Sequence, residues 1–163
     1  MRNIMWTVID SPIGPLRLVE QGGAVTAIEF SPFRDQDGRP RGPRADDDPV
    51  LMETARQLAE YFARQRTEFD LPLSPAGSAW QRDVWDQLLM IGYGETASYG
   101  QIAIRLGKTN AASRAVGHAN GSNPIPIVIP CHRVIGANGT LTGYAGGIDR
   151  KQTLLELEQD ALF

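Results

Sequence analysis

The stretch SYGQIAIRLGKTNAASRAVGHANG, residues 98–121, decides the fold of the second half of this chain. It opens with Ser98 and carries Gln101 three residues later, which is the capping-box pattern of a helix start. Gly107 is typical of a helix stop, and Asn110 is suited to cap a second, alanine-rich helix. Two short helices joined by a tight turn predict a helix-turn-helix.

The second of these helices is nearly free of bulky side chains. Its small residues are Ala111, Ala112, Ala115, Gly117 and Ala119. Arg114 and His118 are four residues apart and therefore share one face. So thin a helix lets another backbone come close, and two interpretations stay open. Either the helix lies in a groove of a nucleic acid, or it packs on a neighbouring helix and leaves Arg114 solvated.

The segment before this stretch predicts a domain boundary. Residues 78–90 carry another capping box and apolar residues at helical spacing, which indicates an amphipathic helix. Two prolines and a glycine in 71–77 are typical of a linker. We therefore expect an N-terminal domain over 1–73 and a C-terminal, mainly α domain with the helix-turn-helix over 78–163.

The N-terminal part is rich in β-prone residues, and we expect an α/β domain made of a small antiparallel sheet and a helix. The expected elements are strands at 4–9, from 16 onward and at 24–30, a helix at 50–65, and a further strand at 69–73. Residues 31–49 mix Pro, Gly, Arg and Asp with almost no apolar side chains, which indicates a mobile surface loop.

The composition excludes several classes of protein. The net charge of -3 argues against a strongly basic nucleic-acid binder, so any such contact must come from a local patch. One cysteine allows no internal disulfide, and with two histidines it cannot supply a structural zinc site. No apolar run is long enough to span a bilayer, and we see no signal peptide. We therefore expect a cytoplasmic protein with no membrane partner and no metal.

The candidate nucleophile follows an apolar run at 125–129, in the segment Pro-Cys-His-Arg at 130–133. A thiol is mostly protonated at neutral pH, so Cys131 needs a base, and His132 is the candidate. Neighbours in a strand point to opposite faces. The two side chains can therefore cooperate only if the backbone leaves strand geometry, which Pro130 favours. The alternative is an inert core cysteine.

A base of this kind needs a third group that orients its ring, and Glu158 is the candidate. It falls on or beside the apolar stripe of a C-terminal helix, where an unpaired carboxylate is costly. A salt bridge with a nearby arginine is the alternative. Residues 136–147 hold five glycines around Tyr144, which suits a pocket wall close to a ligand and equally suits a surface turn.

Taken together, these segments resemble one family over about residues 78–160. The shared motifs are PCHRV at 130–134, YGETASY at 93–99, SRAVG at 113–117, GSNPIPIVIPCHRVIG at 121–136, LTGYAGG at 141–147 and LLELE at 154–158. They are similar to those of the O6-alkylguanine-DNA alkyltransferases, also called methylated-DNA–protein-cysteine methyltransferases. The N-terminal part resembles bacterial members only loosely.

The resemblance implies a role for each matching residue in the chemistry. Cys131 corresponds to the alkyl acceptor, His132 to the base, which acts through a water, and Glu158 to the group that completes the relay. Tyr99 corresponds to the tyrosine that helps to turn the nucleotide out and donates a proton to the departing guanine. The pocket for the extruded base corresponds to Tyr144, Val134 and Ala145.

The resemblance also implies how DNA is bound. Members of the family read the minor groove with the second helix of the motif, which here carries Ser113, Arg114, Ala115 and Gly117. Arg114 corresponds to the arginine that replaces the flipped nucleotide in the duplex. Asn123 corresponds to the asparagine that ties this helix to the active-site segment.

The expected function is therefore the irreversible, stoichiometric transfer of an alkyl group from O6-alkylguanine, and from O4-alkylthymine, to Cys131, without a cofactor. Cooperative self-association on DNA is left open. A cysteine hydrolase and a non-catalytic binder of alkylated DNA are the alternatives. His118 stands where the family has a small or apolar residue, and the resemblance gives no role to His118 or to the loop at 31–49.

Overall fold

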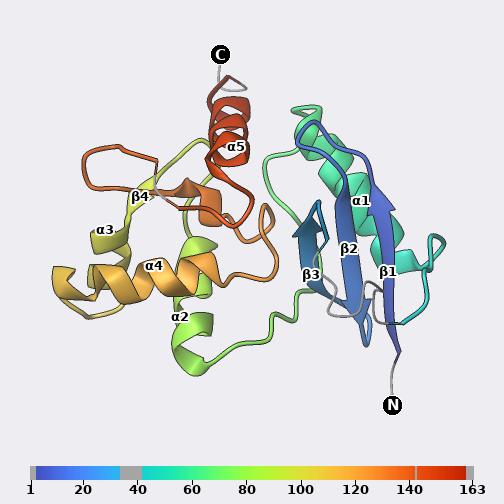
Figure 1. Ribbon diagram of the computed structural model, residues 1–163, viewed down its shortest axis with the longest axis horizontal. Helices are drawn as coiled ribbons and strands as arrows, with labels where there is room; N and C mark the ends of the chain where they lie inside the picture. Colours follow the sequence, from blue (N-terminus) through green and yellow to red (C-terminus); the bar gives the residue numbers. More distant parts are fainter. Residues whose placement is uncertain (1–2, 34–41, 142, 161–163) are drawn as a thin grey trace. The chain divides into compact units, whose positions relative to one another are not determined.

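The computed structural model describes residues 3–33, 42–141 and 143–160. The chain divides into two compact units, Met1–Ala76 and Gly77–Phe163 (Figure 1). The first unit is a small antiparallel sheet with one helix, and the second is mainly helical. The fold class expected from the sequence is therefore confirmed.

The sheet of the first unit is a three-stranded antiparallel meander. Strands β1 (Ile4–Ile9), β2 (Leu16–Gln21) and β3 (Ala24–Phe30) are paired in the order β1-β2-β3. Gly22 and Gly23 join β2 to β3 with φ values of 66° and 84°. Two successive residues with positive φ are what a tight hairpin turn requires, and glycine adopts them without steric cost.

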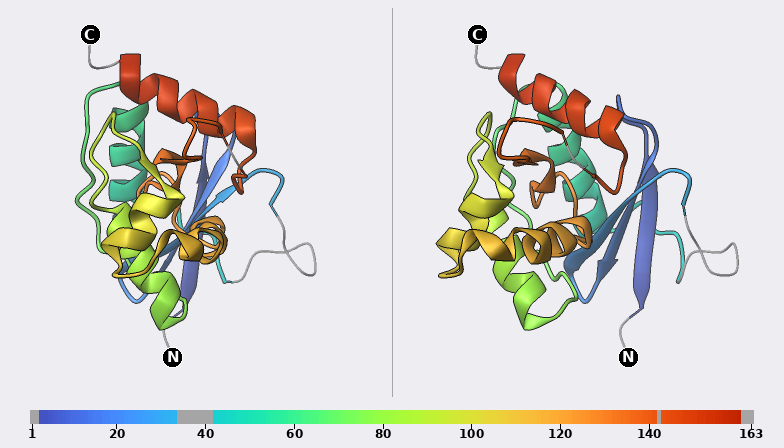
Figure 2. Two further views of the ribbon diagram at one scale, coloured as in Figure 1. Left: turned by 90° about the vertical axis from the view of Figure 1, so that its left-hand side faces the viewer. Right: turned by 60° about the vertical axis from the view of Figure 1, so that its left-hand side comes forward.

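Helix α1 (Pro49–Phe62) lies along one face of this sheet (Figure 2). Asp48 is its N-cap, since the Asp48 carboxylate accepts a hydrogen bond from the backbone N–H of Leu51 at 3.1 Å. Pro49 takes the first helical position, where no N–H is needed. The core of the unit comprises Leu16, Leu18, Val25, Ile28, Leu51, Leu58 and Tyr61.

One expectation for the first unit was wrong, and a second, the loop at 31–49, is tested only in part. Residues 69–73 form no strand: Leu73 makes an isolated parallel bridge with Val25. Pro72 has no N–H to give to a ladder, so the pairing cannot extend along the run. Within 31–49, residues 34–41 lie outside the described residues, but the part that follows is anchored to β1, since the N–H of Ala45 donates to the carbonyl of Trp6 at 2.8 Å.

The helix-turn-helix lies in the second unit. Helix α2 (Ala79–Leu88) precedes helix α3 (Tyr99–Arg105), and both begin with the expected capping box, at Ser78 and at Ser98. Gly107 has a φ of 76° and stops α3 as expected. The second helix of the motif is α4 (Ser113–Gly121).

The start of α4 differs from the expectation. Asn110 is not its cap: the 3-10 turn Asn110–Ala112 comes first, and the α-helix begins at Ser113. The Asn110 side chain instead accepts a hydrogen bond from Ser113 Oγ at 3.2 Å. The indole N–H of Trp85 on α2 donates to the carbonyl of Ala119 at 2.8 Å, which fixes α4 on the core of the unit.

The rest of the second unit carries the candidate site. Strands β4 (Ala97–Ser98) and β5 (Val134–Ile135) form a short parallel pair, and helix α5 (Ile148–Asp160) ends the described chain. The apolar run at 125–129 is buried without forming a strand. Within the described ranges, we find no helix with the length and apolarity needed to cross a membrane.

Candidate active site

Cys131 lies at the start of a 3-10 turn, Cys131–Arg133, directly after the buried run. The backbone turns at Pro130, which has φ −80° and ψ 65°, and the N–H of Cys131 donates to the carbonyl of Ile129 at 2.8 Å. The chain therefore leaves strand geometry at the point where cooperation between Cys131 and His132 requires it. Cys131 is only 4% exposed and is a free thiol.

His132 and Glu158 form a buried pair. Nε2 of His132 lies 2.7 Å from Oε2 of Glu158, and the two side chains are 0% and 1% exposed. A carboxylate can only accept hydrogen bonds, so Nε2 carries the proton of the neutral ring. Nδ1 is then left with its lone pair, and it has no hydrogen-bond partner among the described residues.

Arg133 binds the same carboxylate from the other side. Its Nε and Nη2 donate to Glu158 at 2.8 and 2.9 Å, and its Nη1 donates to the carbonyl of Ile91 at 2.7 Å. The two sequence interpretations of Glu158 therefore hold together, because it contacts the histidine and also forms a salt bridge with an arginine. Arg133 belongs to the PCHRV motif, but its contact with Glu158 was not predicted, although an arginine is the partner that a buried carboxylate needs.

The environment sets the protonation states of the three groups. Burial raises the pKa of the Cys131 thiol, and burial lowers the pKa of His132 despite the nearby carboxylate. Burial alone would raise the pKa of Glu158, but the hydrogen bonds and charges of His132 and Arg133 hold it at about 2. At neutral pH the resting site therefore holds a neutral thiol, a neutral imidazole and a carboxylate.

Lys151 is a further charged group of the site that the sequence reasoning missed. It is 0% exposed, and its Nζ donates to the carbonyl of Val134 at 2.6 Å. Burial has the largest effect on the pKa of Cys131 and raises it, while the side chains of Asn123 and Tyr144 and the positive charge of Lys151 lower it. Helical spacing could have revealed it, since Lys151 precedes the buried Leu154 by three residues and Glu158 by seven.

Asn123 fixes the shape of the run before the cysteine. Its Nδ2 donates to the carbonyl of Ile129 at 2.8 Å, and its Oδ1 accepts from the N–H of Ile125 at 3.0 Å. Ile127 between them has a φ of 75°, a costly conformation for a β-branched residue. Asn120 on α4 donates through Nδ2 to the carbonyl of Cys131 at 3.3 Å. These amides connect the helix-turn-helix to the cysteine turn.

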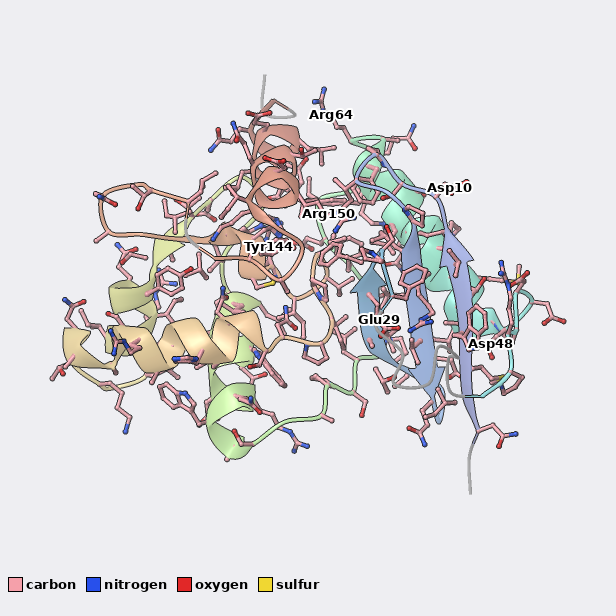
Figure 3. The ribbon with its side chains drawn as sticks, viewed as in Figure 1. Asp10, Glu29, Asp48, Arg64, Tyr144 and Arg150 are labelled. Carbon is pink, nitrogen blue, oxygen red and sulfur yellow. The ribbon has the colours of Figure 1, made fainter. Side chains whose placement is uncertain are left out.

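A pocket of about 730 Å³ lies beside α4. It is lined by Tyr99, Ser113, Arg114, Gly117, His118, Gly121, Ser122, Gly143, Tyr144 and Ala145. Tyr144 stands in the loop between β5 and α5 (Figure 3), and Arg150 holds the end of this loop by donating from Nη1 to the carbonyl of Gly146 at 3.3 Å. The glycine-rich loop is therefore part of a pocket wall.

Some residues that the sequence predicts for the site do not line the pocket. Ala115 is exposed on α4, and its carbonyl accepts a hydrogen bond from the indole N–H of Trp80 at 3.3 Å. Asn123 and Val134 are buried, and neither they nor Cys131 line the pocket. The sulfur is nevertheless close to the pocket wall, because Tyr144 belongs to the lining and its side chain is also one of the groups that lower the pKa of Cys131. Among the described residues, no cluster of three or more His, Cys, Asp or Glu side chains could hold a metal ion.

Comparisons with known proteins cover nearly the whole chain. The family model described as the DNA binding domain of 6-O-methylguanine DNA methyltransferase matches residues 79–160, and the model of its ribonuclease-like domain matches residues 4–75. The chain is 51% identical over 157 residues to the methylated-DNA–protein-cysteine methyltransferase of Mycobacterium tuberculosis, covering 96% of this chain and 93% of the relative.

Solved structures give the same result. The crystal structure of the M. tuberculosis O6-methylguanine methyltransferase matches with a TM-score of 0.87 and 48% identity, covering 97% of this chain and 94% of that one. The same enzyme in complex with DNA matches with a TM-score of 0.87 and 48% identity, covering 96% and 94%.

Proposed function

The chain belongs to the O6-methylguanine DNA methyltransferase family, and from this premise we propose that it transfers an alkyl group from O6 of a damaged guanine in DNA to Sγ of Cys131, once per molecule. The observation that carries the proposal is the buried pair of His132 and Glu158 on the turn that begins with Cys131. This pair supplies a base for the thiol, and the adjoining pocket supplies room for a base taken out of the duplex.

The first step is activation of the thiol. Because the resting thiol and imidazole are both neutral, the proton leaves Sγ only as the substrate arrives, and Nδ1 of His132 receives it through a bridging water. The Glu158 carboxylate, ionised at neutral pH, stabilises the imidazolium that forms. The side chains of Asn123 and Tyr144 and the charge of Lys151, which lower the pKa of the thiol, favour the thiolate.

The second step is displacement at the alkyl carbon. A bond forms between Sγ and this carbon while the bond between the carbon and O6 breaks, and its electron pair leaves with guanine. Tyr99, in the pocket lining, donates the proton that the departing guanine takes up. The Tyr99 oxygen then takes a proton from solvent and the His132 imidazolium gives one back to solvent, so the net result is loss of the thiol proton, gain of one proton by guanine and one thioether formed. None of the groups described at the site offers chemistry that would cleave a thioether, which is why we propose a single turnover.

Access to the damaged base requires that it leave the stack, which costs a few kcal/mol. Arg114 is exposed on α4 and lines the pocket, so it is suited to fill the gap in the duplex. Ala115 and Gly117 keep the same helix thin, which suits the narrow minor groove. Ser113 begins this helix, and Asn123 ties it to the cysteine turn through the buried run. Tyr144, Ala145 and Val134 would contact the extruded base.

Mass spectrometry tests the proposal. The protein is incubated with an excess of duplex DNA containing O6-methylguanine, and its intact mass and the modified peptide are measured. We expect every chain to gain one methyl group on Cys131 and no further one. A chain that binds the damaged duplex and stays unmodified would be a non-catalytic binder, and one that releases product and returns to its original mass would be a hydrolase.

The range of substrates and the mode of binding need their own measurements. O4-alkylthymine presents the same kind of alkyl–oxygen bond on a smaller base, and we propose it as a second substrate, tested by the same mass measurement. Sedimentation of the protein on duplexes of increasing length tests cooperative self-association on DNA. The Cys131→Ala variant is the control in both experiments, since it retains the DNA-binding face and lacks the acceptor.

A further inference from the structure

The exposed face of α4 carries two side chains with a positive or titratable head group, Arg114 and His118. Within the part of the chain that the structure describes, neither side chain makes a hydrogen bond or an ion pair. Other arginines of the chain do pair with carboxylates, namely Arg17, Arg44, Arg56, Arg66 and Arg133. The head groups on α4 are therefore available to a partner outside the chain.

Among the described residues that line the pocket with His118, none is a carboxylate that would neutralise a positive charge. The ionisable or charged neighbours in the pocket lining are Tyr99 from α3, Arg114 from α4 and Tyr144 from the loop before α5. Helices α2 and α3 pack on α4, and their charged side chains, Arg82, Asp83, Asp86 and Arg105, do not line the pocket. In a chain with a net charge of -3, this face is locally positive and suits an anion.

The backbone on either side of His118 is open. A Cβ atom added at Gly117 would meet only the ring of Tyr99, at 3.7 Å, and one added at Gly121 would meet nothing within 4 Å. An extended polyanion can therefore approach the helix closely at this turn. Arg114 lies four residues earlier, which is about 6 Å along the helix axis.

We propose that His118 contacts a backbone phosphate of DNA one helical turn away from Arg114, and that duplex binding strengthens as the imidazole takes up a proton. The inference rests on the proposed function, since it assumes that α4 faces DNA. Histidine changes its charge between about pH 5 and 8. A protonated imidazole carries a positive charge that a phosphate oxygen attracts. Binding is therefore coupled to proton uptake.

The test measures the affinity for an undamaged duplex at about pH 6 and about pH 8 by fluorescence anisotropy. We expect the wild-type protein to bind about three- to tenfold more tightly at the lower pH. His118→Gln should bind weakly at both values. His118→Arg, with a fixed charge, should bind at both values as tightly as the wild type does at the lower pH. Gln159→Ala, an exposed change on α5 outside the pocket, should retain the wild-type pH dependence.

The salt dependence shows whether the partner group is a phosphate. At about pH 6, the plot of log affinity against log salt should lose roughly one unit of slope in His118→Gln. If the loss of affinity in His118→Gln varies with base sequence, His118 contacts a base edge and the inferred phosphate contact is wrong. A pH dependence that persists in His118→Gln would also overturn the inference. If alkyl transfer occurs and wild-type binding is independent of pH, only this inference fails. If the wild type neither binds DNA nor accepts a methyl group, the proposed function fails with it.

Discussion

The imidazole of His132 and the carboxylate of Glu158 are joined by a 2.7 Å contact in a part of the second unit that solvent does not reach. The Glu158→Gln variant keeps the shape of this group and removes its charge. The imidazolium would lose its stabilising partner, and we expect the rate of methyl transfer to fall about 100-fold. A single-turnover experiment with excess protein and methylated duplex measures this rate.

Glu156 offers a matched control for this change. It lies two residues earlier on α5 and is exposed, so Glu156→Gln removes a carboxylate without touching the site. We expect the control to transfer the methyl group at the wild-type rate. If Glu158→Gln, with its fold verified by circular dichroism, reacts as fast as the control, Glu158 has no role in activating the thiol.

The same carboxylate should make the protein sensitive to acid. The pKa of Glu158 is lowered from 4.5 to about 2 in the folded chain, so the unfolded chain binds the proton more readily. The stabilisation is therefore complete above about pH 4.5 and is lost as the pH falls toward 2, with an upper limit of about 3 kcal/mol. Urea unfolding of wild type and Glu158→Gln across this window measures it. The wild type should lose more stability than the variant, and parallel losses would exclude the effect.

Lys151 should increase the nucleophilicity of Cys131. Lys151→Met keeps an unbranched side chain of similar length and removes the charge that lowers the pKa of the thiol. The rate of reaction with O6-benzylguanine should then rise with pH along a curve displaced toward higher pH. Lys151→Arg retains the charge and should restore much of the wild-type profile. A purely structural role would lower the rate at every pH without displacing the curve.

The elements that the sequence predicted best are those specified by local chemistry. Ser78 and Ser98 each precede a glutamine by three residues, and both form the reciprocal hydrogen bonds of a capping box. Gly107 stops α3 for an equally local reason.

The features that escaped prediction depend on specific contacts and not on the conformational preference of each residue. The positive φ of Ile127 is held by the side chain of Asn123 and the buried core, not by its own preference. The role of Arg133 is evident only in the folded chain, where α5 places Glu158 against its guanidinium. Glu158 lies 25 residues later in the sequence. The run at 69–73 has β propensity, yet the proline within it limits the pairing to one bridge. Side-chain contacts in the fold decided the first two cases, and the missing N–H of Pro72 decided the third.

Arg114 should matter for duplex DNA and little for a free base. It is exposed on α4 beside the pocket, where it can occupy the space of an extruded nucleotide. Because extrusion costs a few kcal/mol in a duplex and nothing in free O6-benzylguanine, Arg114→Ala should slow duplex repair about tenfold or more and leave the free base nearly unaffected.

Parallel rate measurements on the two substrates test this expectation, with Arg82→Ala as the control. Arg82 is an exposed arginine on α2 that does not line the pocket, so its loss removes the same charge elsewhere. A general loss of attraction to DNA would slow both variants alike, whereas loss of the inserted side chain slows only Arg114→Ala. Methylated single-stranded DNA should be the least affected DNA substrate, because its bases are already unpaired. If Arg114→Ala slows the reactions with duplex and free base to the same extent, the side chain acts on the chemistry and not on extrusion.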